Sequence, residues 1–449
     1  MSFCRQITAA FGDILPRRAA EYEERIQLYG DILAGQPPWG YTKKSGLYGR
    51  GERRISRLGC ADALCTAYAA LLFATQADIY LSDPATQTFV NEVLQKCGFW
   101  EAMPSFVARC CAYGTGAVRG YLDRGEVRLD FADAVCFMPV KRRDGMVTEG
   151  IFRSGVRIGG RDLVLLERYS FDGTMHIERA LLDPVRNRRS PVSSAGLGET
   201  TQAQLMYPAF AVYRPCGTQF GDSPFGESLY GGCTDTLKAI DTVFDSFSRE
   251  FVLGRKRIIV PSSCIRTVVD PDTGKVSRYF DTDDEVYQAL KCDEEQDLKI
   301  TDNTTELRVT EHIDALNSLL DILCFQTGLS SGTLSFAGNT GLRTAAEVKS
   351  MESRTELTMQ QGRALLAELI EGAVKAVMAL GAAVGQCSLC DVRISFSDTK
   401  TRDRGEVIDE NIRLYQAGLI SRRQALMAVY DCSPEEAERM ERELCEPEP

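Results

Sequence analysis

The sequence predicts a mixed α+β fold that is predominantly helical, and three patterns carry that prediction. Apolar residues recur at helical spacing over several long segments, the longest near residues 344–380. Short runs of strand-forming residues, broken by turn residues, fill the stretch 117–215. Of the 449 residues, 44% are apolar and 26% are charged, the composition of a chain that folds over most of its length into about two or three domain-sized units.

The first 110 residues are expected to be mainly helical. Tyr22–Leu33 has apolar residues at helical spacing, and the glycine and prolines that follow at 35, 37 and 38 end it. Ala61–Leu81 and Thr86–Cys111 are expected to form further buried or amphipathic helices. Each is rich in small and apolar residues, as helices that pack against a core are.

Strands are expected over residues 117–215, because the apolar period changes there. Turn residues at 123–125 and 144–145 separate short apolar runs, and Asp172-Gly173 between two such runs predicts a hairpin. Arg186–Thr201 is polar and rich in Ser and Gly, so we expect an exposed loop.

A long helix is expected from Ser223 to Gly254. Ser223 has the side chain of an N-cap, and Pro224 suits the first helical position. One apolar stripe then follows in steps of three and four, formed by Leu229, Cys233, Leu237, Ile240, Phe244, Phe247 and Phe251.

Residues 255–309 are expected to form a compact insertion between two helices. Arg257–Pro261 predicts a strand, Asp270–Gly274 a turn, and acidic residues crowd Asp281–Asp302. Glu311–Thr327 predicts the second helix.

An uncharged, glycine-rich segment, residues 328–342, follows the second helix. Its composition cannot build a core and predicts a mobile backbone. Thr344 with Glu347 forms a capping box that opens a helix to about Leu380, and Val392–Phe396 predicts a strand that returns to an earlier sheet.

The C-terminal segment is expected to be helical. Ser421 with Gln424, and Ser433 with Glu436, have the spacing of two further capping boxes. The tail after Ser433 carries seven Glu against two Arg.

Charge and cysteine usage limit the classes of function. The net charge of −11 argues against a protein that grips nucleic acid through its phosphates, so either DNA is no partner or it must pass without sticking. Sixteen scattered cysteines indicate reduced thiols in a cytosolic compartment. Asp13 interrupts the only early apolar run, so no signal peptide is expected. The longest apolar stretches without charge, Ala63–Ala77 and Ala376–Cys390, have 15 residues each, short of the roughly 20 that a membrane span needs.

The motifs that resemble catalytic or metal sites are better explained as structure. Gly328–Gly332 matches G-x-S-x-G, but a helix precedes it and both histidines, His176 and His312, come earlier in the chain than Ser330. Gly114–Gly120 resembles a dinucleotide loop, yet strand-forming residues follow where a helix is required, so we expect a tight turn from helix into sheet.

The sequence also lacks complete motifs for a metal site or a nucleotide-binding site. Cys387-Ser388-Leu389-Cys390 is a C-x-x-C without a second pair, and the acidic run at 293–295 suits a solvated loop. No G-x-x-x-x-G-K-[ST] motif is present. We therefore expect no catalytic residue, no metal and no cofactor. Three consecutive basic residues at the end of the first long helix suit either a phosphate contact or the helix C-terminus itself: Arg255, Lys256 and Arg257.

The order of elements from residue 223 onward resembles the portal proteins of long-tailed bacteriophages of Gram-positive bacteria. The sharpest local match is the sequence GLSSGTLSF from residue 328, running into TAAEV at 344–348 and SRT at 353–355. Others are GDSP at 221–224, AGLIS at 417–421 and SPEEAERMERE at 433–443. The motifs are only moderately specific singly, and their order carries the resemblance.

The resemblance implies how the chain is divided. Residues 1–222 would form the wing, 223–254 the first stem helix, 255–309 a β-containing clip, 310–327 the second stem helix and 328–342 the tunnel loop. Residues 343–400 would form a long helix and the return strand of the wing, and 401–449 a short helical crown.

The resemblance also implies a structural function rather than an enzymatic one. The chain would be one subunit of a ring of twelve at one capsid vertex of the virion, assembled in the host cytoplasm. The ring would conduct double-stranded DNA during packaging and ejection. Its partners would be the terminase large subunit, then a head–tail connector or adaptor, and the major capsid and scaffold proteins, with no membrane. The loop residues expected to face DNA are Ser331, Thr333, Leu334, Ser335, Phe336, Asn339, Thr340 and Arg343. For Phe336, a wedge against the duplex and packing on the next subunit are both open.

Two other classes of protein stay open on the sequence alone. The first is a different virion head–tail structural protein, although adaptors are usually much shorter than this chain. The second is a cysteine-dependent hydrolase, although no Cys has a His partner nearby in the sequence.

Overall fold

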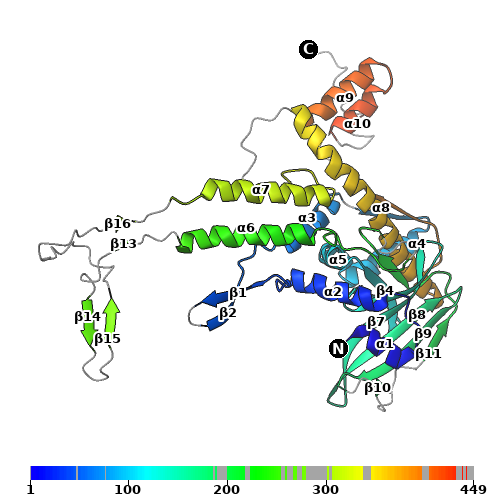
Figure 1. Ribbon diagram of the computed structural model, residues 1–449. Coiled ribbons are helices and arrows are strands. Elements are labelled where there is room, and N and C mark those ends of the chain that lie inside the picture. Colours follow the sequence, from blue (N-terminus) through cyan, green and yellow to red (C-terminus); the bar gives the residue numbers. More distant parts are fainter. Residues whose placement is uncertain are drawn as a thin grey trace, which may run out of the picture. The chain divides into compact units, whose positions relative to one another are not determined.

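The structure is a computed structural model. It describes residues 2–46, 49–75, 77–185, 188–189, 200–217, 223–253, 258–259, 266–269, 276–279, 301–302, 306–336, 345–396, 404–430, 437 and 441. The chain divides into two compact units, each built from separate segments (Figure 1). The first comprises Met1–Ile26, Cys65–Leu229 and Leu357–Pro449, and the second comprises Gln27–Leu64 and Tyr230–Glu356. The predicted mixture is confirmed, and helices outweigh strands, 47% against 26%.

Helices dominate the first 113 residues, as the sequence predicts, but two of their bounds differ. The helix expected over Ala61–Leu81 ends at Leu72, and Ala77–Leu81 is strand β3 instead. The segment Thr86–Cys111 is two helices, because Gly98 adopts a positive φ of 59° between them. The helices are α1 (Phe3–Phe11), α2 (Ala19–Leu33), α3 (Cys60–Leu72), α4 (Pro84–Lys96) and α5 (Phe99–Tyr113).

Two antiparallel sheets follow in the first unit, and the predicted turns lie where expected. One sheet has the order β12-β4-β5, and the other has the order β10-β9-β8-β7-β6 with β11 paired to β9. The strands are β4 (Gly116–Asp123), β5 (Glu126–Asp133), β6 (Phe137–Arg143), β7 (Met146–Ile158), β8 (Arg161–Phe171), β9 (Met175–Asp183), β10 (Arg188–Arg189), β11 (Thr200–Ala203) and β12 (Phe210–Tyr213). The prediction of a plain loop over Arg186–Thr201 is therefore wrong at β10 and at the start of β11, and the residues between these strands lie outside the described part.

Aromatic side chains join the two sheets. The ring of Phe152 on β7 lies 4.8 Å from that of Phe137, 5.1 Å from that of Tyr169 and 6.1 Å from that of Phe210 on β12. Phe137, Phe152, Tyr169 and Phe210 are all buried. Large aromatic rings of this kind contribute much of the apolar area that stabilises a core.

Helix α8 (Ala345–Ala383) supplies the rest of that core. From Leu366 to Leu380 most of its side chains are buried in the first unit, and Gly372 lets it approach β12, because a Cβ there would lie 2.7 Å from that of Ala211. Beyond it, β17 (Val392–Phe396) pairs antiparallel with β3, with Ile394 opposite Ile79. The predicted return strand is thus confirmed, and its partner explains why Ala77–Leu81 is extended.

The segment after Ser223 is not helical, which corrects one prediction. Helix α6 spans Thr234–Leu253, so it ends as predicted but begins eleven residues later than Ser223. Tertiary contacts hold residues 225–229 against the end of α5. The Gly226 amide donates to Thr115 Oγ1 at 2.9 Å, and the Leu229 amide donates to the Cys111 carbonyl at 2.8 Å. Ser223 Oγ accepts from the Phe225 amide, which makes a local turn rather than a helix cap.

The second unit contains a helical pair and a β-hairpin. Helices α6 and α7 (Val309–Gln326) lie side by side, as Figure 1 shows. The hairpin is β1 (Tyr41–Gly46) with β2 (Gly49–Arg54). In the insertion, β13 (Ile258–Ile259) pairs with β16 (Thr301–Asp302), and β14 (Arg266–Val269) pairs with β15 (Val276–Tyr279). The predicted turn Asp270–Gly274 and most of the acidic run lie outside the described residues.

The C-terminal segment forms α9 (Arg404–Gln416) and α10 (Arg422–Tyr430). The predicted capping box of α10 is confirmed, because the Gln424 amide donates to Ser421 Oγ at 3.2 Å and Gln424 Oε1 accepts from the Ser421 amide at 2.9 Å. The capping boxes at Thr344 and Ser433 fall outside the described part of the chain.

Two observations concern the cysteines and the apolar helices. The twelve cysteines that the structure describes are free thiols. Among the helices whose residues are described, none combines the length and the hydropathy needed to cross a membrane.

Candidate functional site

The loop after α7 starts with a well-defined helix end. Gly328 has a positive φ of 78°, and its amide donates to the Phe325 carbonyl. The Leu329 amide donates to the Cys324 carbonyl at 2.8 Å, and both Leu329 and Cys324 are buried. This is a Schellman motif with its apolar contact, which directs the chain sharply away from the helix axis.

Side chains of α7 and α8 hold the described part of the loop. The Gly332 amide donates to Asp321 Oδ1 at 2.8 Å, and the Phe336 amide donates to Asn317 Oδ1 at 3.1 Å, both on α7. At the other side, the Ser330 amide donates to Thr355 Oγ1 at 2.9 Å, and Thr355 Oγ1 donates to Ser330 Oγ at 2.8 Å. These hydrogen bonds hold residues 328–336 in one arrangement, while the predicted mobility of the backbone over 328–342 stays a prediction.

The predicted loop side chains are displayed to solvent in this arrangement. Ser331, Thr333 and Ser335 are exposed, Phe336 is 51% exposed and Leu334 is half-buried. Of the other predicted site residues, Asn339, Thr340 and Arg343 lie outside the described residues, as do Arg255, Lys256 and Arg257. The five described residues of the predicted DNA-facing set therefore lie on one short segment, and four of their side chains are exposed.

An exposed aromatic residue lies beside the loop. Phe325, near the end of α7, is 65% exposed, and the Arg354 guanidinium lies 4.3 Å from its ring centre. Arg354 also donates to the Phe325 carbonyl at 2.8 Å. Such a cation–π contact orders both side chains, and it joins the end of α7 to α8.

Polar contacts fix the two ends of the α6–α7 pair. At one end, Thr236 Oγ1 donates to Gln326 Oε1 at 2.8 Å. At the other end, Glu250 on α6 accepts from Arg308 at 3.1 Å and lies 2.5 Å from His312 Nε2. Hydrogen bonds from Arg308 and then from His312 lower the pKa of Glu250 to about 2. His312 therefore belongs to a structural hydrogen-bonded cluster with Glu250 and Arg308.

Two carboxylates on α6, one turn apart, hold the base of the β1–β2 hairpin. Asp241 accepts from the indole of Trp39 at 2.9 Å and from the Leu58 amide at 3.1 Å. Asp245 accepts from the Ser56 amide at 2.9 Å and from both terminal nitrogens of Arg53, at 2.7 and 2.5 Å. Hydrogen bonding from Arg53 holds the pKa of Asp245 below its ordinary value. Sequence reasoning missed this cluster. The signal that could have found it is a pair of acids at i and i+4 beside the apolar stripe of the helix.

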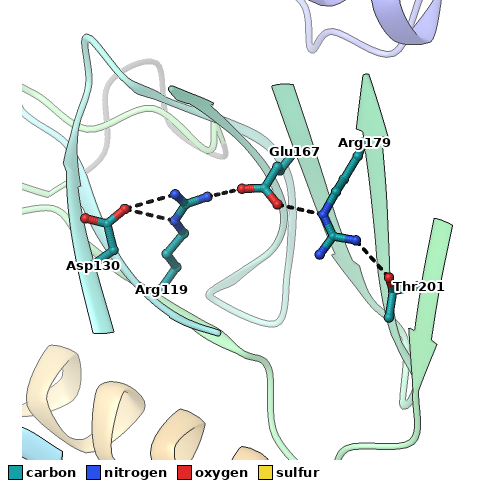
Figure 2. Close-up of polar contacts among 5 residues, drawn as sticks. All are labelled: Arg119, Asp130, Glu167, Arg179 and Thr201. Carbon is teal, nitrogen blue, oxygen red and sulfur yellow. Dashed lines mark hydrogen bonds and ion pairs between the residues drawn. The ribbon is translucent and has the colours of Figure 1, made fainter. Parts of the chain in front are cut away.

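A second ion network crosses the two sheets of the first unit (Figure 2). Arg119 on β4 donates to Asp130 on β5 at 2.9 Å and to Glu167 on β8 at 2.5 Å. Glu167 accepts from Arg179 at 2.9 Å, and Arg179 donates to Thr201 at 2.8 Å. Because Glu167 is only 8% exposed, the two arginines are what keep a buried charge neutralised.

The motifs weighed as catalytic have structural geometry. Ser330 sits in the loop after a helix, so the strand-to-helix elbow of a hydrolase is absent around it. At Gly114, with φ of 84°, α5 turns directly into β4, which confirms the predicted turn. Cys387 and Cys390 contact Met378, and no group of metal-binding side chains occurs among the described residues.

Comparison with known proteins gives one family match. Residues 228–448 match the family described as phage portal protein, SPP1 Gp6-like. No curated protein matches the chain. A solved structure titled "Virion of native gene transfer agent (GTA) particle" is 11% identical, with a TM-score of 0.45 over 95% of this chain and 99% of that one. Another, titled "Neck of empty GTA particle computed with C6 symmetry", is 10% identical, with a TM-score of 0.48 over 95% of this chain and 98% of that one. Both TM-scores lie below 0.5, so the family match alone supports the assignment.

Proposed function

Because the chain belongs, over residues 228–448, to the phage portal family, we propose that it is one subunit of a ring that conducts double-stranded DNA through a capsid vertex. The observation that carries this proposal is the family match itself, which covers α6, the insertion, α7, the loop and α8 in one continuous stretch. The proposal places the protein in the virion, without enzymatic activity or a cofactor.

The assignment of parts follows the elements in order. Residues 1–222 with β17 would form the wing, and the short strands of residues 255–309 the clip. Helices α6 and α7 would form the stem, with the first stem helix beginning at Thr234 rather than Ser223. Residues 328–342 would form the tunnel loop and residues 401–449 the crown.

The fixed ends of the α6–α7 pair support its use as a stem. A ring of identical subunits needs head-to-tail interfaces that close, and rigid helices in parallel arrays can supply them. Contacts at both ends, Thr236 with Gln326 and Glu250 with Arg308, hold α6 and α7 together as one body. A stem built this way would transmit force along its axis without splaying.

The chemistry of the loop suits brief contact with a moving duplex. Its described side chains are uncharged, so they release no counterions and do not hold phosphates tightly. Hydrogen bonds from the loop amides to Asp321, Asn317 and Thr355 position the loop, while Phe336 projects with half its surface exposed. We therefore propose that residues 331–336 face the DNA, together with Asn339, Thr340 and Arg343.

The partners proposed for this ring are those of its packaging role. The clip would meet the terminase large subunit and later a head–tail connector, and the wing would meet the capsid and scaffold proteins. Arg255, Lys256 and Arg257, at the border of stem and clip, would contribute positive charge there.

Negative-stain electron microscopy with native mass spectrometry of the purified chain tests the ring. Rings with a central hole and about a dozen copies are expected. A chain that stays monomeric at high concentration, with scaffold protein present, would reject the portal assignment.

A packaging assay tests the loop separately. Replacing both Leu334 and Phe336 with Gly is expected to reduce the amount of DNA packaged while rings still assemble. Met206→Gly, at another exposed apolar position, serves as the control and should package normally. Loss of ring assembly in the Leu334/Phe336 variant would instead show that the loop is an interface between subunits.

A further inference from the structure

A cleft of about 350 Å³ opens in the first unit where helix α1 meets the two antiparallel sheets. Its walls come from β4, β5, β7 and β8, together with the segment that joins β5 to β6. This volume lies within the range of clefts that bind small groups in other proteins. The proposed function leaves the cleft without a role.

The carbon lining of the cleft is largely aromatic. Phe131 and Phe152 line it together with Val164. Packing holds Phe131 in place, since its ring centre lies 5.1 Å from that of Phe106. The cleft is open at Gly155, which is exposed, because a Cβ at that position would meet no atom within 4 Å. An apolar body can therefore enter from solvent.

The charged groups on one side of the cleft already balance one another. Arg119 donates to Asp130 and to Glu167 (Figure 2). Glu167 also accepts from Arg179, so two guanidiniums are paired with two carboxylates. Of this network, Arg119 and Asp130 line the cleft. This side therefore offers a bound group no net charge.

Arg153 on β7 lines the other side and brings a positive charge that no carboxylate balances. Its Nη2 donates to the Val135 carbonyl at 2.6 Å and its Nη1 to Gln6 Oε1 at 3.5 Å, so both acceptors are neutral. The guanidinium also lies 4.6 Å from the ring centre of Phe3. Burial raises the pKa of the neighbouring Cys136 thiol, so this group is neutral as well. Among the described residues, no ion pair joins Arg153 to an Asp or a Glu.

Gln6 on α1 adds a free donor beside this charge. It is 4% exposed, and its Oε1 is the atom that accepts from Arg153. Its Nε2 makes no hydrogen bond to any residue that the structure describes, and Gln6 lines the cleft. A buried donor without an acceptor is unfavourable, so a guest that supplies an acceptor there is favoured.

We propose that this cleft binds a carboxylate carried on an apolar body. Arg153 and Gln6 hold the carboxylate, because a guanidinium and an amide together present N–H donors to both of its oxygens. The carbon body packs on Phe131 and Phe152. One unbalanced positive charge matches one negative charge, whereas a phosphate monoester of charge near −2 would leave an excess beside Asp130. The inference does not rest on the proposed ring, because all of these residues belong to one chain.

Ligand-observed NMR on the purified full-length chain tests this chemistry with two probes of the same shape. Phenylacetate carries a carboxylate on an aromatic body, and phenylacetamide replaces the carboxylate with a neutral amide. Phenylacetate should bind, and phenylacetamide should bind about tenfold more weakly or worse. Equal affinity for the two probes, or no binding of phenylacetate up to about 10 mM, would overturn the proposal.

Substitutions locate the bound probe. Arg153→Met removes the charge but keeps an apolar side chain, and it should weaken phenylacetate binding about tenfold or more. Gln6→Glu puts a carboxylate of the chain itself beside Arg153, so the probe should no longer bind. Arg157→Met, at an exposed position on the same strand, is the matched control and should bind as the wild type does.

Melting temperatures of the variants are measured first, and those of folded variants should stay close to that of the wild type. Wild-type affinity in the folded cleft variants would place the probe elsewhere and reject the site. If a variant unfolds, the comparison of the two probes on the wild type still decides.

A peptide competition separates two sources of the carboxylate, a free organic acid and an acidic side chain of a protein partner. Acetyl-Phe-Glu-amide and acetyl-Phe-Gln-amide compete with phenylacetate for the wild-type chain. Tighter binding of the Glu peptide than of phenylacetate assigns the cleft to a protein partner, and the reverse order assigns it to a free acid. Equal displacement by the Glu and Gln peptides would show that the charge plays no part, and the proposal would fail while the ring stands.

Discussion

Replacing Asp245 with Asn should release the base of the β1–β2 hairpin from α6. Asp245 is nearly buried, with 10% of its side chain exposed, and it accepts three hydrogen bonds. Two come from Arg53, whose side chain is 20% exposed, and one comes from the Ser56 amide. The Asn side chain has the same shape but no charge, so Arg53 would lose its counter-ion.

The size of the effect follows from these contacts. Breaking one partner of a buried ion pair costs about 3–5 kcal/mol, and hydrogen bonds to a charged group contribute about 1.5–3 kcal/mol each. Arg53 keeps some exposure to water, and Asn can still accept one hydrogen bond, so we expect about 2–4 kcal/mol of local destabilisation. That corresponds to roughly 30- to 1,000-fold in the equilibrium for local opening.

Amide hydrogen exchange measures this opening directly, because the Ser56 amide is itself a donor to Asp245. Its exchange should speed up by the factor above, while amides in the core of α8 keep their rates. Asp235→Asn, at an exposed position on the same helix, is the matched control and should change nothing by more than about 0.5 kcal/mol. Unchanged exchange at Ser56 in the Asp245 variant would refute the view that this carboxylate holds the hairpin.

Three further changes test other parts of the structure. Glu167→Gln leaves two guanidiniums without their shared counter-ion and should lower the free energy of unfolding by about 3 kcal/mol, read from the midpoint of urea unfolding; a shift no larger than that of a surface substitution would contradict this. Gly226→Ala should cost more than about 2 kcal/mol in the same assay, because its Cβ would lie 2.0 Å from the Gly114 carbonyl, whereas Gly155→Ala, with no atom within 4 Å, should be close to neutral. Glu250 has a lowered pKa, so its stabilising effect is complete above its ordinary pKa of 4.5 and is lost as pH falls toward about 2; the difference in melting temperature between wild type and Glu250→Gln should therefore shrink below pH 4.5, and a constant difference would argue against the ion cluster.

Features that depend on neighbouring residues could be predicted from the sequence. The hairpin turn at Asp172-Gly173 and the capping box of Ser421 with Gln424 involve groups within a few positions of each other, and both are confirmed. The return strand Val392–Phe396 was predictable from its β-branched and aromatic residues.

Features set by contacts between residues far apart in the sequence could not be predicted. Ala77–Leu81 is extended because it pairs with Val392–Phe396, more than 300 positions away. Ser223 and Pro224 have the chemistry of a helix start, but the close approach of Gly226 to Gly114 holds that segment in another conformation. In both cases a tertiary contact overrides a sound local preference.

Part of the candidate site could also be predicted from the sequence, and part could not. The glycine-rich composition identified the loop as a special segment, but it predicted mobility over residues 328–336, where the structure has hydrogen bonds. The groups that anchor the loop, Asn317, Asp321 and Thr355, lie on helices, where a polar residue at helical spacing looks the same whether it faces water or a loop.

The β1–β2 hairpin is an element that apolar periodicity does not predict. Its strands carry mostly polar residues, so neither the helical nor the strand period identifies them, and no element was predicted there. The contacts that hold the base of the hairpin come from α6, where Asp241 accepts from Trp39 and Asp245 accepts from Arg53. Because these partners lie far apart in the sequence, no local pattern predicts them.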